Sequence, residues 1–292
     1  MTTAPTPDVS VIIPHFNQFL QLTKCLESLE RQTFPRAAVE IIVADNGAPG
    51  DADEIAQKFP AVKFIHAAER GAACARNAAL ACARGRAIAF IDADCIAAPD
   101  WIERGLEGLK DAELSGGRIV VSVENNDHPT PVEAFEQVFA FRQRDYVEKK
   151  RFSATANLFA RREAALAIGS FTNGLSEDVD WCRRGAALGF HLAFNSKSIV
   201  THPARRDWSE LIRKWERLIA ERWKGFDRTG VFGALRWMVL AAATALSTGP
   251  HLLQVMTSAE LKSARDRIAA ASVLARIRWW RARKMAAMLT AK

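Results

Sequence analysis

The sequence lacks the signs of a disulfide or zinc framework. Its five cysteines are odd in number and none belongs to a Cys-x-x-Cys pair: Cys25, Cys74, Cys82, Cys95 and Cys182. Unpaired thiols are typical of a reducing compartment, so we expect neither disulfides nor a structural zinc site. Glycine, proline and charge contents are ordinary, which excludes disordered and fibrous classes.

Two nucleotide-binding signatures are also missing. The first expected strand is not followed by the Gly-x-Gly-x-x-Gly of dinucleotide-binding proteins, and no Gly-Lys-Ser/Thr phosphate loop occurs. A nucleotide bound here must therefore be held differently, by carboxylates and a metal ion. Residues 1–8 have no apolar core of a secretory signal, so we expect the protein to remain in the cytoplasm.

The charge is unevenly distributed along the 292 residues. The net charge of +7 divides into −4 for residues 1–202 and +11 for residues 203–292, and six of the eight tryptophans follow residue 200. A basic, Trp-rich tail suggests an anionic partner, either a membrane surface or a nucleic acid. No nucleic-acid-binding motif is recognisable, so we expect no nucleic-acid partner.

The first hundred residues alternate between apolar runs and helical patterns. Strands are expected at 9–13, 40–44, 62–65 and 88–91, with helices at 20–33, 51–59 and 72–83. This order predicts an α/β fold with a parallel sheet covered by helices. Its carboxyl edge carries Asp45 and the pair Asp92 and Asp94. Open α/β sheets bind their ligands at such an edge, and paired carboxylates there favour a divalent cation. The simpler alternative to a metal site is that the aspartates are only turn residues at a strand end.

The remaining elements are expected as follows. Asn17 is placed to cap the first helix, and Ser176 can cap a later helix that begins with Glu177 and Asp178. Strands are predicted at 117–123, 153–159, 191–194 and 198–200, and helices at 100–110, 132–150, 161–168 and 208–225. Phe135, Phe139 and Phe141 are interpreted as core residues of the 132–150 helix.

Five motifs in this order resemble family 2 glycosyltransferases of the GT-A fold, over residues 9 to about 225. They are Val-Ile-Ile-Pro-His-Phe-Asn (11–17), Val-Ala-Asp-Asn-Gly (43–47), Gly-Ala-Ala-Cys-Ala-Arg-Asn (71–77), Phe-Ile-Asp-Ala-Asp (90–94) and Ser-Glu-Asp-Val-Asp-Trp-Cys-Arg-Arg (176–184). The resemblance implies a Rossmann-like nucleotide-binding sheet flanked by helices over residues 1–228. Residues 229–292 then form a helical, basic appendage that binds a membrane or mediates oligomerisation.

The resemblance also implies roles for individual residues. It assigns the nucleotide pocket to Pro14, Phe16 and Asn17, the base contact to Asp45, and a place near the base and phosphates to Arg76. It implies that Asp92 and Asp94 hold Mg²⁺ or Mn²⁺ against the diphosphate. Asp92 is in this way also a nucleotide-binding residue. His202 stands where some members have a metal or phosphate ligand, and a structural histidine is an equal alternative.

The pair Glu177 and Asp178 is implied to be catalytic, with Asp178 as the general base. Favourable placement of acids at a helix start is the alternative interpretation. Two departures from the family pattern stand out: Asp-Asn-Gly-Ala replaces Asp-Asp/Asn-x-Ser at 45–48, and Ile219 replaces the glutamine of Gln-x-x-Arg-Trp. The second argues against a processive polysaccharide synthase.

The implied function is metal-dependent transfer of a sugar from a nucleotide-sugar donor, UDP-linked, to a hydroxyl of a lipid-linked or polysaccharide acceptor at the cytoplasmic face of the membrane. One base and no second nucleophile imply inversion at C1. The alternatives are a sugar nucleotidyltransferase, which would want a Gly-rich basic loop after the first strand, and a catalytically idle carbohydrate-binding scaffold on the same fold.

The tail contains an uncharged stretch, residues 237–259, which Gly249-Pro250 divides. The unbroken part, 237–248, is shorter than the ~20 apolar residues of a spanning helix. Residues 269–289 place arginines around Trp279-Trp280 in a basic amphipathic pattern. We therefore expect association in the plane of the membrane, with a helical cover, a homodimer surface or a true span as alternatives.

Overall fold

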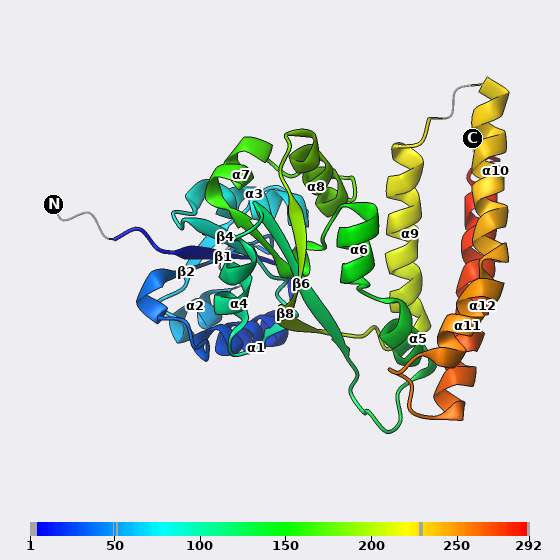
Figure 1. Ribbon diagram of the computed structural model, residues 1–292, viewed down its shortest axis with the longest axis horizontal. Coiled ribbons are helices and arrows are strands. Elements are labelled where there is room, and N and C mark those ends of the chain that lie inside the picture. Colours follow the sequence, from blue (N-terminus) through cyan, green and yellow to red (C-terminus); the bar gives the residue numbers. More distant parts are fainter. Residues whose placement is uncertain (1–4, 49, 51, 228–229, 291–292) are drawn as a thin grey trace. The chain divides into compact units, whose positions relative to one another are not determined.

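The computed structural model describes residues 5–48, 50, 52–227 and 230–290, which form two compact units (Figure 1). The sheet unit comprises Met1–Val120 and Phe141–His202, and the helical unit comprises Val121–Ala140 and Pro203–Lys292. The expected domain boundary at 228/229 lies outside the described residues. The two compact units divide after residues 120, 140 and 202, so the helical unit includes a segment from the middle of the chain.

An eight-stranded sheet organises the first unit in the order β3-β2-β1-β4-β7-β6-β8-β5 among the described residues. The strands are β1 Val9–His15, β2 Val39–Asp45, β3 Lys63–His66, β4 Ala87–Phe90, β5 Ile96–Ala97, β6 Leu114–Ser122, β7 Leu158–Arg161 and β8 Leu192–Pro203. β1 to β4 are mutually parallel, as predicted, whereas β7 is antiparallel to β4 and β6, and β5 to β8.

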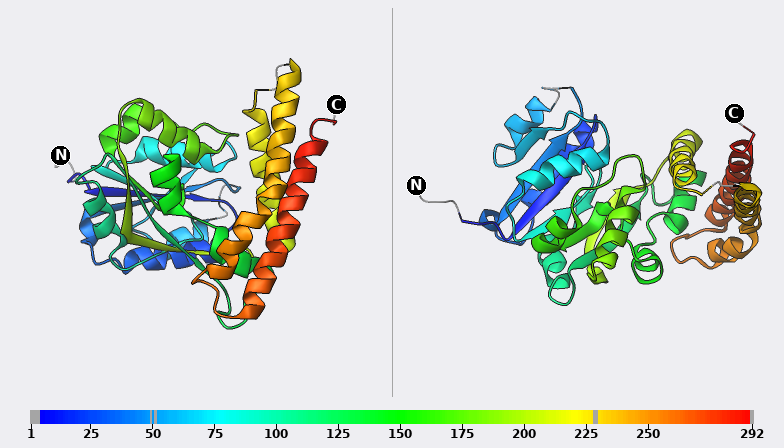
Figure 2. Two further views of the ribbon diagram at one scale, coloured as in Figure 1. Left: turned by 45° about the vertical axis from the view of Figure 1, so that its right-hand side comes forward. Right: turned by 90° about the horizontal axis from the view of Figure 1, so that it is seen from above.

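Apolar side chains alternate between the two faces of this sheet. In β1, Val11 and Ile13 enter one buried cluster with helices α1 (Phe19–Glu30) and α4 (Trp101–Gly108), while Ile12 enters a second cluster with α3 (Ala72–Cys82) and α8 (Glu177–Ala187). Both faces are therefore covered, which explains why these strands are continuous apolar runs. The helices are α1 Phe19–Glu30, α2 Asp53–Lys58, α3 Ala72–Cys82, α4 Trp101–Gly108, α6 Gln143–Lys150, α7 Arg162–Ile168 and α8 Glu177–Ala187 (Figure 2).

Several local predictions are wrong. Asn17 does not cap α1, because it adopts a left-handed conformation (φ 52°) and Gln18 occupies the N-cap position. The single helix expected at 132–150 is two helices, α5 Pro131–Phe139 and α6, separated where Phe141 has a φ of 49°. Phe141 packs against the core of the sheet unit, whereas α5 belongs to the helical unit. The two short strands expected at 191–200 are one strand, β8.

The helical unit consists of α5 with α9 Trp208–Lys224, α10 Gly230–Leu246, α11 Thr248–Thr257 and α12 Ala264–Ala287. α5 begins with a capping box between Thr130 and Glu133. α12 packs against the other four helices, and α9, α10 and α12 run side by side in Figures 1 and 2. Trp237 of α10 is fully buried and its Nε1 donates a 2.8 Å hydrogen bond to the carbonyl of Met285.

One helical stretch of the described residues, Phe232–Thr257, is long and apolar enough to cross a membrane, judged by length and composition only. Its mean hydropathy is 1.2, and only 17% of its most apolar window is buried within the structure. The interruption expected at Gly249-Pro250 falls at Ser247, between α10 and α11, and both residues lie within the first turn of α11. Helix length alone therefore does not exclude a membrane span, contrary to the sequence argument.

Candidate active site

The carboxyl ends of β1 and β2 bring a histidine against a carboxylate. His15 and Asp45 are register partners, and His15 Nδ1 lies 2.7 Å from Asp45 Oδ1, with both side chains buried. His15 Nε2 accepts a 3.0 Å hydrogen bond from the backbone N–H of Gln18, which leaves Nδ1 as the protonated nitrogen that donates to Asp45. The Gly47 N–H also donates to Asp45 Oδ1. The carboxylate predicted to contact the base is thus held in one orientation.

The turn after β1 exposes an aromatic face beside this pair. Pro14 is partly buried, while Phe16 is exposed on 45% of its surface and follows directly after β1. The Arg70 guanidinium carbon lies 5.3 Å from the centroid of the Phe16 ring. A planar ring and a planar cation at a strand end form a surface on which a nucleotide base can stack.

Arg76 of α3 joins two carboxylates that are far apart in sequence. Its Nη2 lies 2.7 Å from Asp92 Oδ1, and its Nη1 lies 3.0 Å from Glu177 Oε1 at the start of α8. The Arg76 side chain is only 4% exposed. Burial acts to lower the pKa of Arg76, but the charges of Asp92 and Glu177 outweigh it and raise this pKa. The arginine therefore remains charged and ties β4 to α8.

A glycine and an asparagine position the helix that carries Arg76. Asn46 is buried, and its Nδ2 donates 2.8 Å hydrogen bonds to the carbonyls of Ala67 and Glu69, while its Oδ1 accepts one from the Gly71 N–H. Gly71 has a φ of 129°, and a Cβ there would lie 2.6 Å from Asn173 Oδ1. Only glycine fits this entry to α3.

Asp178 is the titratable group best suited to accept a proton. It lies in the first turn of α8, next to Glu177, and its Oδ1 accepts a 2.8 Å hydrogen bond from the Val179 N–H. Burial, followed by the charge of Glu177, raises the pKa of Asp178 to about 6, although Arg76 acts to lower it. A carboxylate with a pKa just below neutrality is ionised in use and yet basic enough to take a proton efficiently.

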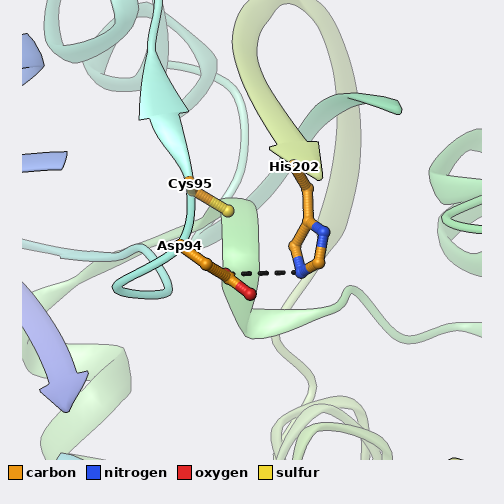
Figure 3. Close-up of side chains that lie close together, drawn as sticks. All are labelled: Asp94, Cys95 and His202. Atoms are coloured by element: carbon orange, nitrogen blue, oxygen red, sulfur yellow. Dashed lines mark ion pairs between the residues drawn. The ribbon is translucent and has the colours of Figure 1, made fainter. Parts of the chain in front are cut away.

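Asp94 and His202 form a second cluster, with Cys95 beside them (Figure 3). His202 Nε2 lies 3.4 Å from Asp94 Oδ1, and the ligand atoms of the three residues lie within 4.8 Å of one another. The imidazole also packs on the ring of Phe141, with centroids 4.4 Å apart. Asp92 is not in this cluster, since its carboxylate pairs with Arg76. The two aspartates thus have different partners in the structure.

The donor set of this cluster is compatible with a divalent cation. A carboxylate and an imidazole together suit Mn²⁺ better than Mg²⁺, which prefers oxygen ligands alone. Burial and the charges of Asp92 and Asp94 raise the pKa of the Cys95 thiol well above its usual value. Thiolates suit softer metals than Mn²⁺ or Mg²⁺, so Cys95 is not counted among the ligands of such an ion. Asp94 and His202 would hold the ion, with other positions left to phosphate oxygens and water.

The sequence interpretation missed three members of this site. His15 lies within the quoted motif 11–17, but nothing local shows that its partner is Asp45 of the next strand. Cys95 directly follows Asp94, and Phe171 packs its ring 5.9 Å from the Arg76 guanidinium carbon. The residues predicted from the sequence all lie in the sheet unit. They lie at or near the carboxyl ends of β1, β2 and β4, at the start of α8, in α3 (Arg76) and near the end of β8 (His202).

A mixed sheet whose parallel half ends in carboxylates, faced by an acidic helix start, defines a glycosyltransferase of the GT-A fold. A family model described as "Glycosyl transferase family 2" matches residues 10–169, more than half of the chain. The chain belongs to glycosyltransferase family 2.

Individual relatives agree with this assignment. Glycosyltransferase AglE of Haloferax volcanii is 32% identical over 221 residues, which cover 73% of this chain and 72% of AglE. The pre-mycofactocin glycosyltransferase of Mycobacterium tuberculosis is 28% identical over 215 residues, 69% of this chain and 44% of that protein. Among solved structures, mannosyltransferase PcManGT of Pyrobaculum calidifontis, in complex with GDP-Man and Mn²⁺, matches with a TM-score of 0.58 at 18% identity, covering 97% of this chain and 84% of PcManGT.

These findings confirm the predicted family and the GT-A fold. They also establish that the protein is a glycosyltransferase by descent. At 18% identity the likeness to PcManGT concerns the fold alone, so its ligands belong to that protein.

Proposed function

We propose that the protein transfers a sugar from a nucleoside diphosphate sugar to an acceptor hydroxyl, with a divalent cation as cofactor. The observation that carries this proposal is the bridge made by Arg76, which links Asp92 after β4 to Glu177 at the start of α8. It brings Asp178 close enough to Asp92 for the charge of Asp92 to raise its pKa. A proton acceptor and a phosphate-binding edge thus belong to one site.

The donor half of the site is the edge formed by β1, β2 and β4. Asp45, oriented by His15, would accept a hydrogen bond from the base, and the Phe16 ring would stack on it. A divalent ion at Asp94 and His202 would neutralise charge that develops on the departing diphosphate. We propose a UDP-linked donor, and GDP-mannose is the natural comparison because PcManGT binds it.

The acceptor half depends on Asp178. Its carboxylate would take the proton of the attacking hydroxyl, an effect worth ~10²–10⁴-fold in rate. Glu177 is held by Arg76 at 3.0 Å and is therefore engaged in positioning rather than free to attack C1. One base without a free second nucleophile favours a single displacement with inversion.

We also propose a lipid-linked or polysaccharide acceptor at the cytoplasmic face of the membrane. A cavity of about 390 Å³ beside Phe141 is lined by Arg118, Arg142 and Arg144 and by one acid, Asp145, which pairs with Arg142. The excess of positive charge suits an anionic acceptor. In the helical unit, α10 and α11 expose large apolar side chains that favour association in the plane of the membrane, a homodimer being the alternative: Phe232, Leu235, Met238, Val239, Leu246, Leu252, Leu253 and Met256.

The test is release of nucleoside diphosphate from a panel of UDP-sugars and GDP-mannose, with and without Mn²⁺, followed by anomer analysis of the product. The proposal predicts Mn²⁺-dependent release from one donor and inverted configuration at C1. Retention at C1 would refute the single displacement. A nucleotidyltransferase would instead form a nucleotide-sugar from a nucleoside triphosphate, and an idle scaffold would release nothing from any donor.

A further inference from the structure

Two arginines of α12 stack on tryptophans of α9 within the helical unit. The Arg281 guanidinium carbon lies 3.5 Å from the centroid of the Trp215 ring, and that of Arg276 lies 3.9 Å from the Trp208 ring. Stacking of this kind fixes the plane of a guanidinium while leaving its N–H groups free to donate. The arginines of α12 are therefore oriented before any ligand arrives.

Arg281 and its neighbour on α12, Arg278, are half-buried, and one nitrogen of each guanidinium group is enclosed. The Nε atoms of Arg278 and Arg281 are buried and have no hydrogen-bond acceptor. Burial lowers the pKa of Arg278; burial, together with repulsion from Arg278 and Arg222, lowers the pKa of Arg281 to about 9. No carboxylate of the residues that the structure describes offsets either shift.

The same unit neutralises its other enclosed cations. Arg205 and Lys214 both lie 3.0 Å from the buried carboxylate of Glu136. The absence of a neighbouring carboxylate in the described part of the chain thus distinguishes Arg278 and Arg281 from these two cations. Guanidinium groups stay charged in proteins, so two half-buried arginines without a neighbouring carboxylate form a site that an anion from outside the chain would stabilise.

We propose that Arg278 and Arg281 bind a phosphoryl group, with the headgroup phosphate of a membrane lipid as its source. Phosphate oxygens match the planar N–H fork of arginine, which gives charge-assisted, bidentate hydrogen bonds. The lipid source is favoured because the same unit exposes the apolar side chains of α10 and α11. The inference concerns binding alone and does not depend on the transfer reaction proposed above.

The experiment compares the full-length protein with Arg281→Gln and Arg283→Gln. Arg283 is exposed on the same helix, so its replacement makes the same change of charge without touching the cluster. Co-sedimentation is measured with vesicles of phosphatidylcholine alone and with added phosphatidic acid. Inorganic pyrophosphate is added separately while thermal unfolding is followed, in the presence of EDTA so that the metal-dependent diphosphate site proposed above does not respond.

We expect Arg281→Gln to weaken binding to the phosphatidic acid vesicles about tenfold or more, as loss of a charge-assisted pair requires, and Arg283→Gln to change it less than threefold. The melting temperature of the wild type and of Arg283→Gln should rise with pyrophosphate, but that of Arg281→Gln should not. Loss of the pyrophosphate response with unchanged vesicle binding would support the phosphoryl site and assign it to a soluble ligand.

Equal behaviour of the two variants in both assays would overturn the proposal, because the arginines would then be structural. Far-UV circular dichroism verifies the fold of each variant, and Arg278→Gln replaces Arg281→Gln if the latter does not fold. Sugar transfer to a water-soluble acceptor, measured in parallel, keeps a failure of this site distinct from a failure of the proposed activity.

Discussion

Replacing Arg76 by methionine removes the cation that neutralises the carboxylates of Asp92 and Glu177. The change should destabilise the protein and shift the pH dependence of its activity. Removing one partner of a buried ion pair costs about 3–5 kcal/mol. The side chains of Asp92 and Glu177 are 31% and 17% exposed, so water recovers part of this cost. We expect the lower figure, about 3 kcal/mol, which lowers the melting temperature of a unit of this size by roughly 6–12 °C.

The same change affects Asp178. The charge of Arg76 acts to lower the pKa of Asp178, whereas the charges of Glu177 and Asp92 act to raise it. Without the guanidinium, the pKa of Asp178 should rise further above about 6, and the acid limb of the kcat profile should move to higher pH. Arg84→Met is the matched control, since Arg84 is 61% exposed and its partner Glu40 keeps the hydrogen bonds that it accepts from Ser10 Oγ and from the backbone N–H of residue 84. Its loss should cost less than about 1 kcal/mol. Identical melting temperatures and identical acid limbs for the two variants would refute the reasoning.

Three further predictions follow from the geometry. Asp178→Asn should be more stable than the wild type by about 1–3 kcal/mol in urea unfolding at pH 7.5. The pKa of Asp178 is about 6 in the folded protein and 3.8 for an ordinary aspartate, so the stability of the wild type declines as the pH rises from 3.8 through about 6. A variant less stable than the wild type would contradict this. His15→Ala should raise KM for the donor about tenfold with kcat changed less than threefold, because it releases Asp45 from its 2.7 Å hydrogen bond. An effect on kcat alone would argue against a contact between Asp45 and the nucleotide base. Asp94→Asn and His202→Gln should each weaken Mn²⁺ activation about 100-fold in a metal titration, and unaltered affinity in either would remove that residue from the metal site.

The parallel half of the sheet could be predicted from the sequence because it depends on local pattern. Each of β1, β2 and β4 is an apolar run ended by a polar residue, and buried parallel strands need no information beyond that pattern. The same logic correctly placed Asp45, Asp92 and Asp94 after their strands. The family resemblance supplied Arg76 and the pair at the start of α8, whose roles no local pattern indicates.

What could not be predicted depends on contacts between distant residues. The division of the 132–150 segment arises because Phe141 packs in one unit while α5 packs in the other, a conflict that helical periodicity does not show. The pairing of Asp94 with His202 and of Asp92 with Arg76 likewise follows from β5 pairing with β8 and from α3 packing on the sheet. Neighbouring aspartates with the same sequence context thus acquire different partners.

The account depends most directly on Asp178 as the base that activates the acceptor. Sugar transfer should be measured for Asp178→Asn and for Asp180→Asn, which makes the same change of charge on the same helix, where Asp180 pairs with Arg184 at 3.0 Å. We predict that Asp178→Asn loses ~10²–10⁴-fold in kcat while donor and Mn²⁺ binding are retained, and that Asp180→Asn stays within about tenfold of the wild type. Transfer by Asp178→Asn within threefold of the wild-type rate would contradict the proposed mechanism.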